Sequence, residues 1–185
     1  MATNDPAAHS AGSDAGPDAG PDAGPGVRVR RVRPEEWPAL RAIRLRALAD
    51  APDAFGATLA DEAMDPDATW QQRASDRVSF VAELAGRLVG VAGVGPAPVE
   101  APVAMLYAMW VEPEVRGTGV ATAIVEAAVD WARDAGYPGL GLGVTTTNAR
   151  AIAFYERLGF IDTGQRYPLR QGSRLDIQIM VRTFA

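Results

Sequence analysis

The chain of 185 residues contains no cysteine and no lysine, and His9 is its one histidine. Without cysteine it can form no disulfide, no thiolate metal site and no cysteine nucleophile, and we expect no bound metal. Without lysine it can form neither a Schiff base nor a Walker-type phosphate loop, because that loop requires a lysine. A serine or threonine nucleophile would find no imidazole in the core, since His9 lies near the N-terminus. The sequence therefore predicts a protein with few reactive groups.

Residues 1–26 differ in composition from the rest of the chain. They consist almost entirely of Ala, Gly, Pro, Asp and Ser, and the tetrad AGPD at 15–18 is repeated at 19–22. Such a segment buries too little apolar surface to offset its ordering entropy, so we expect a disordered acidic tail. Residues 27–185 are then expected to form one domain, because a chain that is 48% hydrophobic and of this length can bury a single core.

The charge balance and the hydropathy pattern exclude several partners. The formal net charge is −5, and four aspartates of the tail carry −4 of it, which leaves about −1 for residues 27–185. A nucleic-acid surface needs clustered positive charge, so we expect no nucleic-acid partner. No apolar run approaches the roughly 20 residues of a membrane span, and the N-terminus lacks the basic-then-apolar order of a secretory signal. We therefore expect a cytoplasmic protein without a membrane partner.

Hydrophobic periodicity and turn residues divide residues 27–185 into strands and helices. Apolar residues at helical spacing predict helices over 34–50 and 118–135. Asn148 as a cap and Gly159 as a stop predict a helix over 149–158, and a short helix is expected over 70–76. Alternating or continuous apolar runs predict strands over 27–32, 78–84, 87–94, 103–111, 140–146, 160–167 and 174–182. Ala85 and Gly86 separate two of these runs and predict a hairpin. The order β-α-α-β-β-β-α-β-α-β-β indicates an α/β fold.

The segment RGTGVA at 116–121 follows the predicted strand 103–111 and opens the predicted helix 118–135. Unpaired N–H groups at a helix N-terminus favour an anion, and glycine lets a ligand oxygen approach the main chain. The turn is therefore suited to bind phosphate. It matches neither the dinucleotide fingerprint, which requires Gly or Ala where Thr122 stands, nor the Walker loop. On this turn alone, the alternative is a strand-to-helix connection that holds no ligand.

A second group of residues lies in the segment TTNARAIAFYERLGF at 146–160. Asn148 ends a strand, and Tyr155 follows seven residues later, which is about two helical turns. Both side chains can therefore lie on one side of the helix and reach one shared ligand.

With these two motifs the chain resembles the GCN5-related N-acetyltransferase (GNAT) superfamily, over residues 27–184. Arg116, Gly119 and Ala121 match the family motif Q/R-x-x-G-x-G/A, and the pattern N-x-x-x-x-x-x-Y-x-x-x-G-F is matched by Asn148, Tyr155, Gly159 and Phe160. The resemblance implies the acyl-CoA N-acyltransferase fold, in which a mixed β-sheet is splayed between strands 4 and 5 and flanked by helices. It also implies acetyl-CoA as co-substrate and direct acetyl transfer to a primary amine in a ternary complex.

The resemblance also assigns roles to residues. In relatives the turn equivalent to 116–121 wraps the diphosphate of coenzyme A with main-chain N–H groups. The end of the preceding strand pairs with the pantetheine arm, and an asparagine of the next strand holds that arm. The corresponding cofactor-binding residues of this chain are Met109, Trp110, Val111, Arg116, Gly117, Thr118, Gly119, Val120, Ala121, Thr122, Asn148, Ala151 and Tyr155.

Tyr155 is the expected catalytic residue, because in relatives the phenol stands near the sulfur and can protonate a departing thiolate. Its reference pKa is about 10, against about 8.5 for a cysteine-like thiol. The alternative is a tyrosine that packs in the core. The strand 103–111 has no glutamate, although some relatives carry their general base there. The candidates for the base are therefore Asp61, Glu62, Glu100 or a chain of water molecules, and the alternative for each carboxylate is a solvated surface group.

Acceptor specificity is expected in the segments 50–62, 95–102 and 165–173. The residues expected to bind the acceptor are Phe55, Asp61, Glu62, Tyr107 and Tyr167. The favoured acceptor is a small amine such as an amino sugar, a polyamine or an amino acid, and the alternative is a peptide N-terminus or a protein lysine. An alternative of another class is a non-catalytic module that senses acyl-CoA. The resemblance also suggests a homodimer, because relatives often dimerise.

Overall fold

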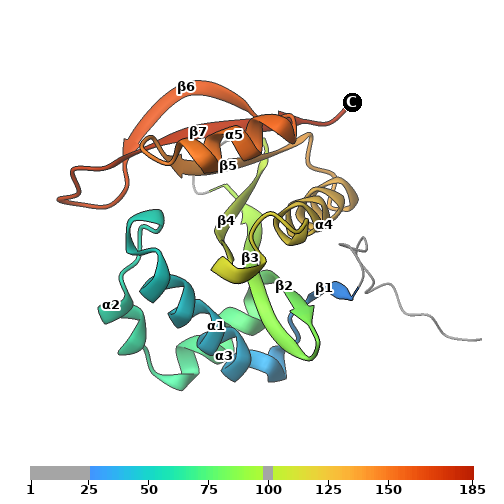
Figure 1. The fold of residues 1–185 in the computed structure, drawn as a ribbon, viewed down its shortest axis with the longest axis vertical. Coiled ribbons are helices and arrows are strands. Elements are labelled where there is room, and N and C mark those ends of the chain that lie inside the picture. Colours follow the sequence, from blue (N-terminus) through green and yellow to red (C-terminus); the bar gives the residue numbers. More distant parts are fainter. Residues whose placement is uncertain (1–25, 98–101) are drawn as a thin grey trace, which may run out of the picture.

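The computed structural model describes residues 26–97 and 102–185 (Figure 1). The expected tail, apart from Gly26, and the candidate base Glu100 lie outside the described residues. The strands are β1 (Val27–Arg31), β2 (Val78–Leu84), β3 (Arg87–Pro96), β4 (Ala104–Val111), β5 (Gly139–Thr145), β6 (Ile161–Pro168) and β7 (Asp176–Thr183). The helices are α1 (Trp37–Asp50), α2 (Leu59–Ala63), α3 (Asp67–Asp76), α4 (Val120–Asp134) and α5 (Ala149–Arg157). Short 3-10 turns are η1 (Pro34–Glu36), η2 (Pro52–Ala54) and η3 (Pro113–Val115).

One sheet of seven strands runs through the described residues in the order β1-β2-β3-β4-β5-β7-β6. Neighbouring strands are antiparallel except β4 and β5, which are parallel. These two strands pair only from Ala104 to Leu106 of β4 and over 140–142 of β5, and they separate beyond these positions although both continue. The separation confirms the expected mixed sheet that is splayed between strands 4 and 5.

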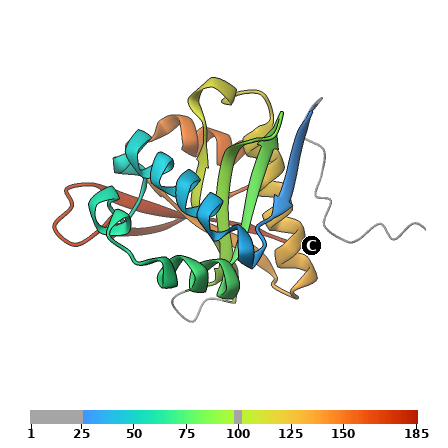
Figure 2. The same ribbon diagram turned by 90° about the horizontal axis from the view of Figure 1, so that it is seen from below.

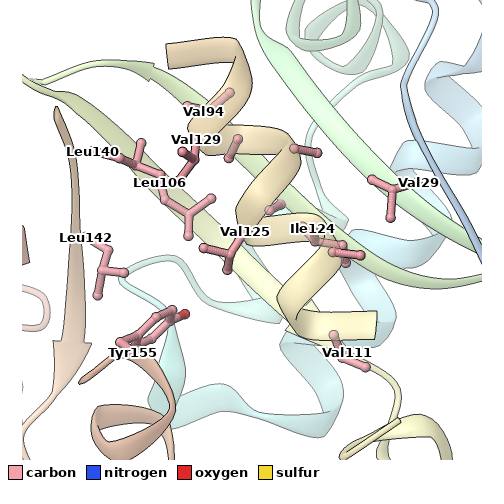
Figure 3. Packing of buried hydrophobic residues seen from close by; sticks show 14 of the residues in the cluster. Val29, Val94, Leu106, Val111, Ile124, Val125, Val129, Leu140, Leu142 and Tyr155 are labelled. Carbon is pink, nitrogen blue, oxygen red and sulfur yellow. The ribbon is translucent and has the colours of Figure 1, made fainter. Parts of the chain in front are cut away.

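Helices cover the sheet from two sides. The apolar residues of α4 recur at helical spacing and pack against β1 to β5, and α5 joins the same core through Tyr155 (Figure 3). α1 and α3 lie on the opposite side of β2, β3 and β4 (Figures 1 and 2). Within 26–97 and 102–185, no helix combines the length and apolar character that crossing a bilayer would require.

Positive backbone φ angles mark the ends of two predicted elements. Gly119 has a φ of 95° and directly precedes α4, so this helix begins at Val120 and not at the predicted residue 118. Ala85 and Gly86 have φ angles of 49° and 76° and form the turn between β2 and β3. Two consecutive residues of positive φ suit the twist of a hairpin, which confirms the predicted one.

A β-bulge in β4 breaks the strict alternation of its side chains. Between two aligned pairs, β4 carries two residues where β3 carries one. The extra residue is accommodated at Ala108, whose φ is 56°. Trp110 consequently packs in the cluster with α1, whereas Val111 packs in the cluster with α4.

Candidate active site

A cavity of about 520 Å³ opens between the end of β4 and helix α5, where β4 and β5 have separated. It is lined by Ala51, Ala54, Phe55, Met109, Trp110, Val111, Arg116, Gly117, Gly119, Ala121, Thr122, Asn148, Arg150, Ala151, Phe154, Tyr155, Arg157 and Leu158. The structure therefore gathers every predicted cofactor-binding residue except Thr118 and Val120 around one cavity, together with Phe55.

The turn before α4 carries main-chain N–H groups that the described part of the protein does not use. Within this part, the N–H groups of 117 and 119–122 donate no hydrogen bond. Gly117 and Gly119 have φ angles of 86° and 95°, and a Cβ built on either one would have no atom within 4 Å. The conformation favours glycine, and the open space leaves the amides accessible. Such unpaired N–H groups at a helix N-terminus attract an anion.

Thr118 and Val120 take part in this turn without lining the cavity. The Thr118 hydroxyl donates to the Val115 carbonyl at 2.7 Å, and its N–H donates to the same oxygen at 3.4 Å. The side chain of Val120 is fully buried in the core under α4. The side chains of these two predicted residues therefore stabilise the turn and the helix, and they do not form the cavity wall.

The side chain of Arg116 is held by the protein itself. Its Nε donates to the Val111 carbonyl at 2.9 Å, and its guanidinium pairs with the carboxylate of Asp50. Asp50 also accepts a hydrogen bond from Trp110 Nε1 at 2.9 Å. The hydrogen bond from Trp110 and that from Arg116 lower the pKa of Asp50 despite its partial burial. An ionised Asp50 thus joins the end of α1 to the end of β4 and to the turn before α4.

Tyr155 reaches the cavity wall from α5. Its ring packs against Phe154 and Phe160, with ring centroids 5.1 Å and 5.7 Å away, and the residue is 8% exposed. Burial raises the pKa of the Tyr155 phenol above its ordinary value. The phenol therefore stays protonated at neutral and mildly alkaline pH, which is the form that can donate a proton.

Asn148 both caps α5 and lines the cavity. Its Oδ1 accepts a hydrogen bond from the N–H of Ala151 at 3.1 Å, as the first residue before a helix commonly does. Within the described residues the side-chain Nδ2 of Asn148 donates no hydrogen bond, so its hydrogens are available to a ligand in the cavity.

The cavity is also lined by residues that were not predicted from the sequence. They are Ala51 before η2, Ala54 at its end, Arg150, Phe154 and Arg157 of α5, and Leu158 directly after that helix. Residues 150, 154 and 157 follow helical spacing, so this pattern in the sequence could have indicated them. No acidic side chain of the described residues lines the cavity, and its charged groups are three arginines.

Asp61 and Glu62 belong to α2 and do not line the cavity. The Thr58 hydroxyl donates to the Asp61 carboxylate at 2.7 Å and accepts from the Asp61 N–H at 3.2 Å, which caps the helix. Arg44 donates from Nε and Nη2 to Glu62 at 2.9 Å and 3.0 Å. Both carboxylates thus have structural partners. The helix itself is absent from the sequence prediction, because five residues are too few to establish a helical period.

Tyr107 and Tyr167, two further expected acceptor residues, also lie outside the cavity lining. The ring of Tyr107 lies over Gly93, where a Cβ would come within 2.1 Å of its Cε2 atom, and burial raises the pKa of this phenol. Tyr167 lies on β6 opposite Ile177 and is 49% exposed. Of the five expected acceptor residues, Phe55 is the one at the cavity.

The sequence profile of the Acetyltransferase (GNAT) family matches residues 37–160, and the chain belongs to this family. A mycothiol acetyltransferase from Thermobispora bispora is 35% identical over 143 residues, which cover 73% of this chain and 46% of that protein. The chain spans about half the length of the curated relatives it matches.

Solved structures share the fold. An acetyltransferase of the GNAT family from Streptococcus pneumoniae has a TM-score of 0.74 at 18% identity, covering 86% of this chain and 99% of that chain. The structure of yncA from Salmonella typhimurium, solved with its cofactor acetyl-CoA, has a TM-score of 0.67 at 20% identity and covers 86% of this chain and 95% of that chain. The splayed sheet is therefore the GNAT fold.

Proposed function

We propose that the protein transfers the acetyl group of acetyl-CoA directly to a primary amine of a small molecule, within a ternary complex. One observation carries this proposal: unpaired N–H groups of the turn before α4 open into the cavity between the end of β4 and helix α5, where β4 has separated from β5. Membership of the acetyltransferase family supports the same activity.

The residues around the cavity fit coenzyme A. The two glycines of the turn leave space beside the free N–H groups, so a diphosphate can approach the main chain there. Arg150 and Arg157 add positive charge to the same cavity, and none of the described residues brings a carboxylate that would repel the diphosphate. Beyond Leu106 the main chain of β4 is not paired with β5, so Met109 to Val111 can hold the pantetheine arm like an added strand.

The residues of the chain would then act by positioning and by proton transfer. When bound, acetyl-CoA supplies a thioester whose carbonyl carbon an amine can attack and whose sulfur can leave. Tyr155 holds a proton on its phenol oxygen and would give it to the departing sulfur. The attacking nitrogen would lose its proton to water or to Glu100, which lies outside the described residues, because no carboxylate of the described residues lines the cavity. Holding two reactants in attack geometry can contribute several kcal/mol, on the order of 7 to 11 in the best intramolecular cases.

The size of the cavity supports a small acceptor. A volume of about 520 Å³ lies within the range of about 300 to 1,000 Å³ that is usual for small-molecule sites, and the pantetheine arm would occupy part of it. The space left for the acceptor suits an amino sugar, a polyamine or an amino acid better than a folded protein surface.

The test combines calorimetry of acetyl-CoA binding with a thiol-release assay on primary amines. The panel contains amino sugars, polyamines, amino acids and peptides with free N-termini. We expect binding of acetyl-CoA and release of free thiol with at least one small amine. Binding without release on any amine would instead indicate an acyl-CoA sensor, and release with peptides alone would indicate a peptide acetyltransferase.

A further inference from the structure

The connection between β6 and β7 contacts the cavity wall from outside. Arg170 of this connection donates from Nη1 to the main-chain carbonyls of Pro52 at 3.2 Å and Phe55 at 2.9 Å. These carbonyls flank η2 and lie 118 and 115 residues away in the sequence. One guanidinium group therefore fastens both ends of η2 to a distant loop.

The two segments also approach each other through their main chains. A Cβ on Gly56 would lie 3.1 Å from the carbonyl oxygen of Leu169, so a larger residue would press on the loop. The loop is held by its own hydrogen bonds, from the Leu169 N–H to the Leu175 carbonyl at 2.8 Å and from the Ser173 N–H to the Arg170 carbonyl at 3.0 Å. Figures 1 and 2 show this loop reaching toward the segment between α1 and α2. Arg170 thus extends from a fixed support.

The segment that Arg170 fastens is part of the cavity wall. Ala51, Ala54 and Phe55 line the cavity, and Phe55 is 5% exposed. The guanidinium carbon of Arg44 lies 4.6 Å from the centroid of the Phe55 ring and supports it from the side of α1. The opposite wall is α5, which packs with β5 and β7, and the loop of Arg170 belongs to that half of the sheet. Arg170 therefore connects the two halves that the splayed sheet separates.

We propose that Arg170 is a positioning residue that keeps these two walls together and so restricts the acceptor to an amine on a slender arm, such as a small aliphatic amine. The proposal rests on the proposed acetyl transfer and names the class of its acceptor. Arg170 does not line the cavity and acts through the main chain of residues 52–55. Moving the wall of Ala51, Ala54 and Phe55 outward to admit a wider acceptor would require the two hydrogen bonds of Arg170 to break.

The test measures which acceptor arm the cavity admits, without requiring turnover. Two conjugates of coenzyme A are titrated by calorimetry. In both, an acetyl group joins the sulfur of coenzyme A to an acceptor arm, which is butylamine in one conjugate and a pentapeptide in the other. We expect the wild-type protein to bind the butylamine conjugate at least ten-fold more tightly. The variant Arg170→Ala should lose most of that preference while its affinity for coenzyme A stays within two-fold, and Arg170→Lys should retain part of it.

The matched control is Arg174→Ala, since Arg174 lies in the same loop, is exposed, and donates no side-chain hydrogen bond to a described residue. It should keep the wild-type preference. An unchanged preference in Arg170→Ala, or a wild-type preference for the peptide arm, would overturn the proposal. If the wild-type protein does not bind coenzyme A, that result counts against the proposed function itself. In that case hydrogen exchange decides on Arg170: faster exchange at 52–56 in Arg170→Ala supports its role, and unchanged exchange refutes it.

Discussion

Replacement of Gly119 by alanine separates the conformational role of this glycine from its role in ligand binding. Gly119 has a φ of 95°, and no atom lies within 4 Å of a Cβ built there. Alanine would thus meet no neighbour, but in the left-handed region it costs roughly 1 to 2 kcal/mol. For a domain of this size that corresponds to a melting temperature lower by about 2 to 8 °C.

Gly136, at the other end of α4, provides the matched control. Its φ is 79° and a Cβ there would also meet nothing within 4 Å, so Gly136→Ala carries the same conformational cost. The two variants should therefore lose similar stability, and Gly119→Ala alone should lose affinity. If the added methyl group displaces one charge-assisted hydrogen bond, worth about 1.5 to 3 kcal/mol, the affinity for coenzyme A falls by about ten-fold to a hundred-fold.

Thermal melting and calorimetric titration with coenzyme A measure the two effects on the same samples. Equal melting temperatures with a selective loss of affinity in Gly119→Ala would support the assignment of the turn to the diphosphate. If Gly119→Ala binds coenzyme A as tightly as Gly136→Ala does, the ligand does not approach this glycine and the reasoning fails.

Three further predictions concern catalysis and stability. Tyr155→Phe should lower turnover by about ten-fold or more, with acetyl-CoA affinity unchanged, because phenylalanine keeps the ring contacts with Phe154 and Phe160; steady-state kinetics with unaltered turnover would remove the proton-donor role. The kcat/KM for an amine should rise with pH toward the pKa of that amine, since no described carboxylate lines the cavity. Burial raises the pKa of Tyr155, so ionisation of this phenol should cause no fall in kcat/KM at mildly alkaline pH. Rate profiles for two amines of different pKa check this, and a shared midpoint would reveal a base on the protein. Ala85→Asn should stabilise the hairpin, because asparagine tolerates the φ of 49° better than alanine. A gain of about 1 kcal/mol would raise the melting temperature by about 2 to 4 °C. A melting temperature below that of the wild-type protein would contradict this account of the turn.

Most of the fold could be predicted from sequence because apolar runs bounded by turn residues mark the strands and α4 has an apolar face at helical spacing. The apolar face of α4 and the hairpin at Ala85 and Gly86 are local signals, and the structure contains both. The bulge at Ala108 could not be predicted, since alanine rarely adopts positive φ and β4 is apolar on both faces. The short helix α2 is not predicted, because its five residues are too few to establish a helical period and it packs against α1.

The cofactor side of the candidate site follows from contiguous motifs, whereas the acceptor side depends on contacts between distant segments. The sequence places Asp61 and Glu62 near Phe55, but it does not reveal that Arg44 of α1 pairs with Glu62. The contact of Arg170 with Phe55 spans 115 residues and has no local signature. A side chain that is close in sequence to cavity-lining residues can therefore have its interaction partners away from the cavity.

The position of Asp50 has a thermodynamic consequence for how two substrates would share the enzyme. Its carboxylate pairs with Arg116 of the turn before α4, and the next residue, Ala51, lines the cavity beside η2. A ligand that drew Arg116 away would leave the Asp50 carboxylate without its arginine partner beside Trp110. The change would reach the cavity wall at Ala51, which is one peptide unit away. Thermodynamic linkage then requires reciprocity. If binding of the first substrate changes the affinity for the second through this carboxylate, binding of the second changes the affinity for the first by the same factor.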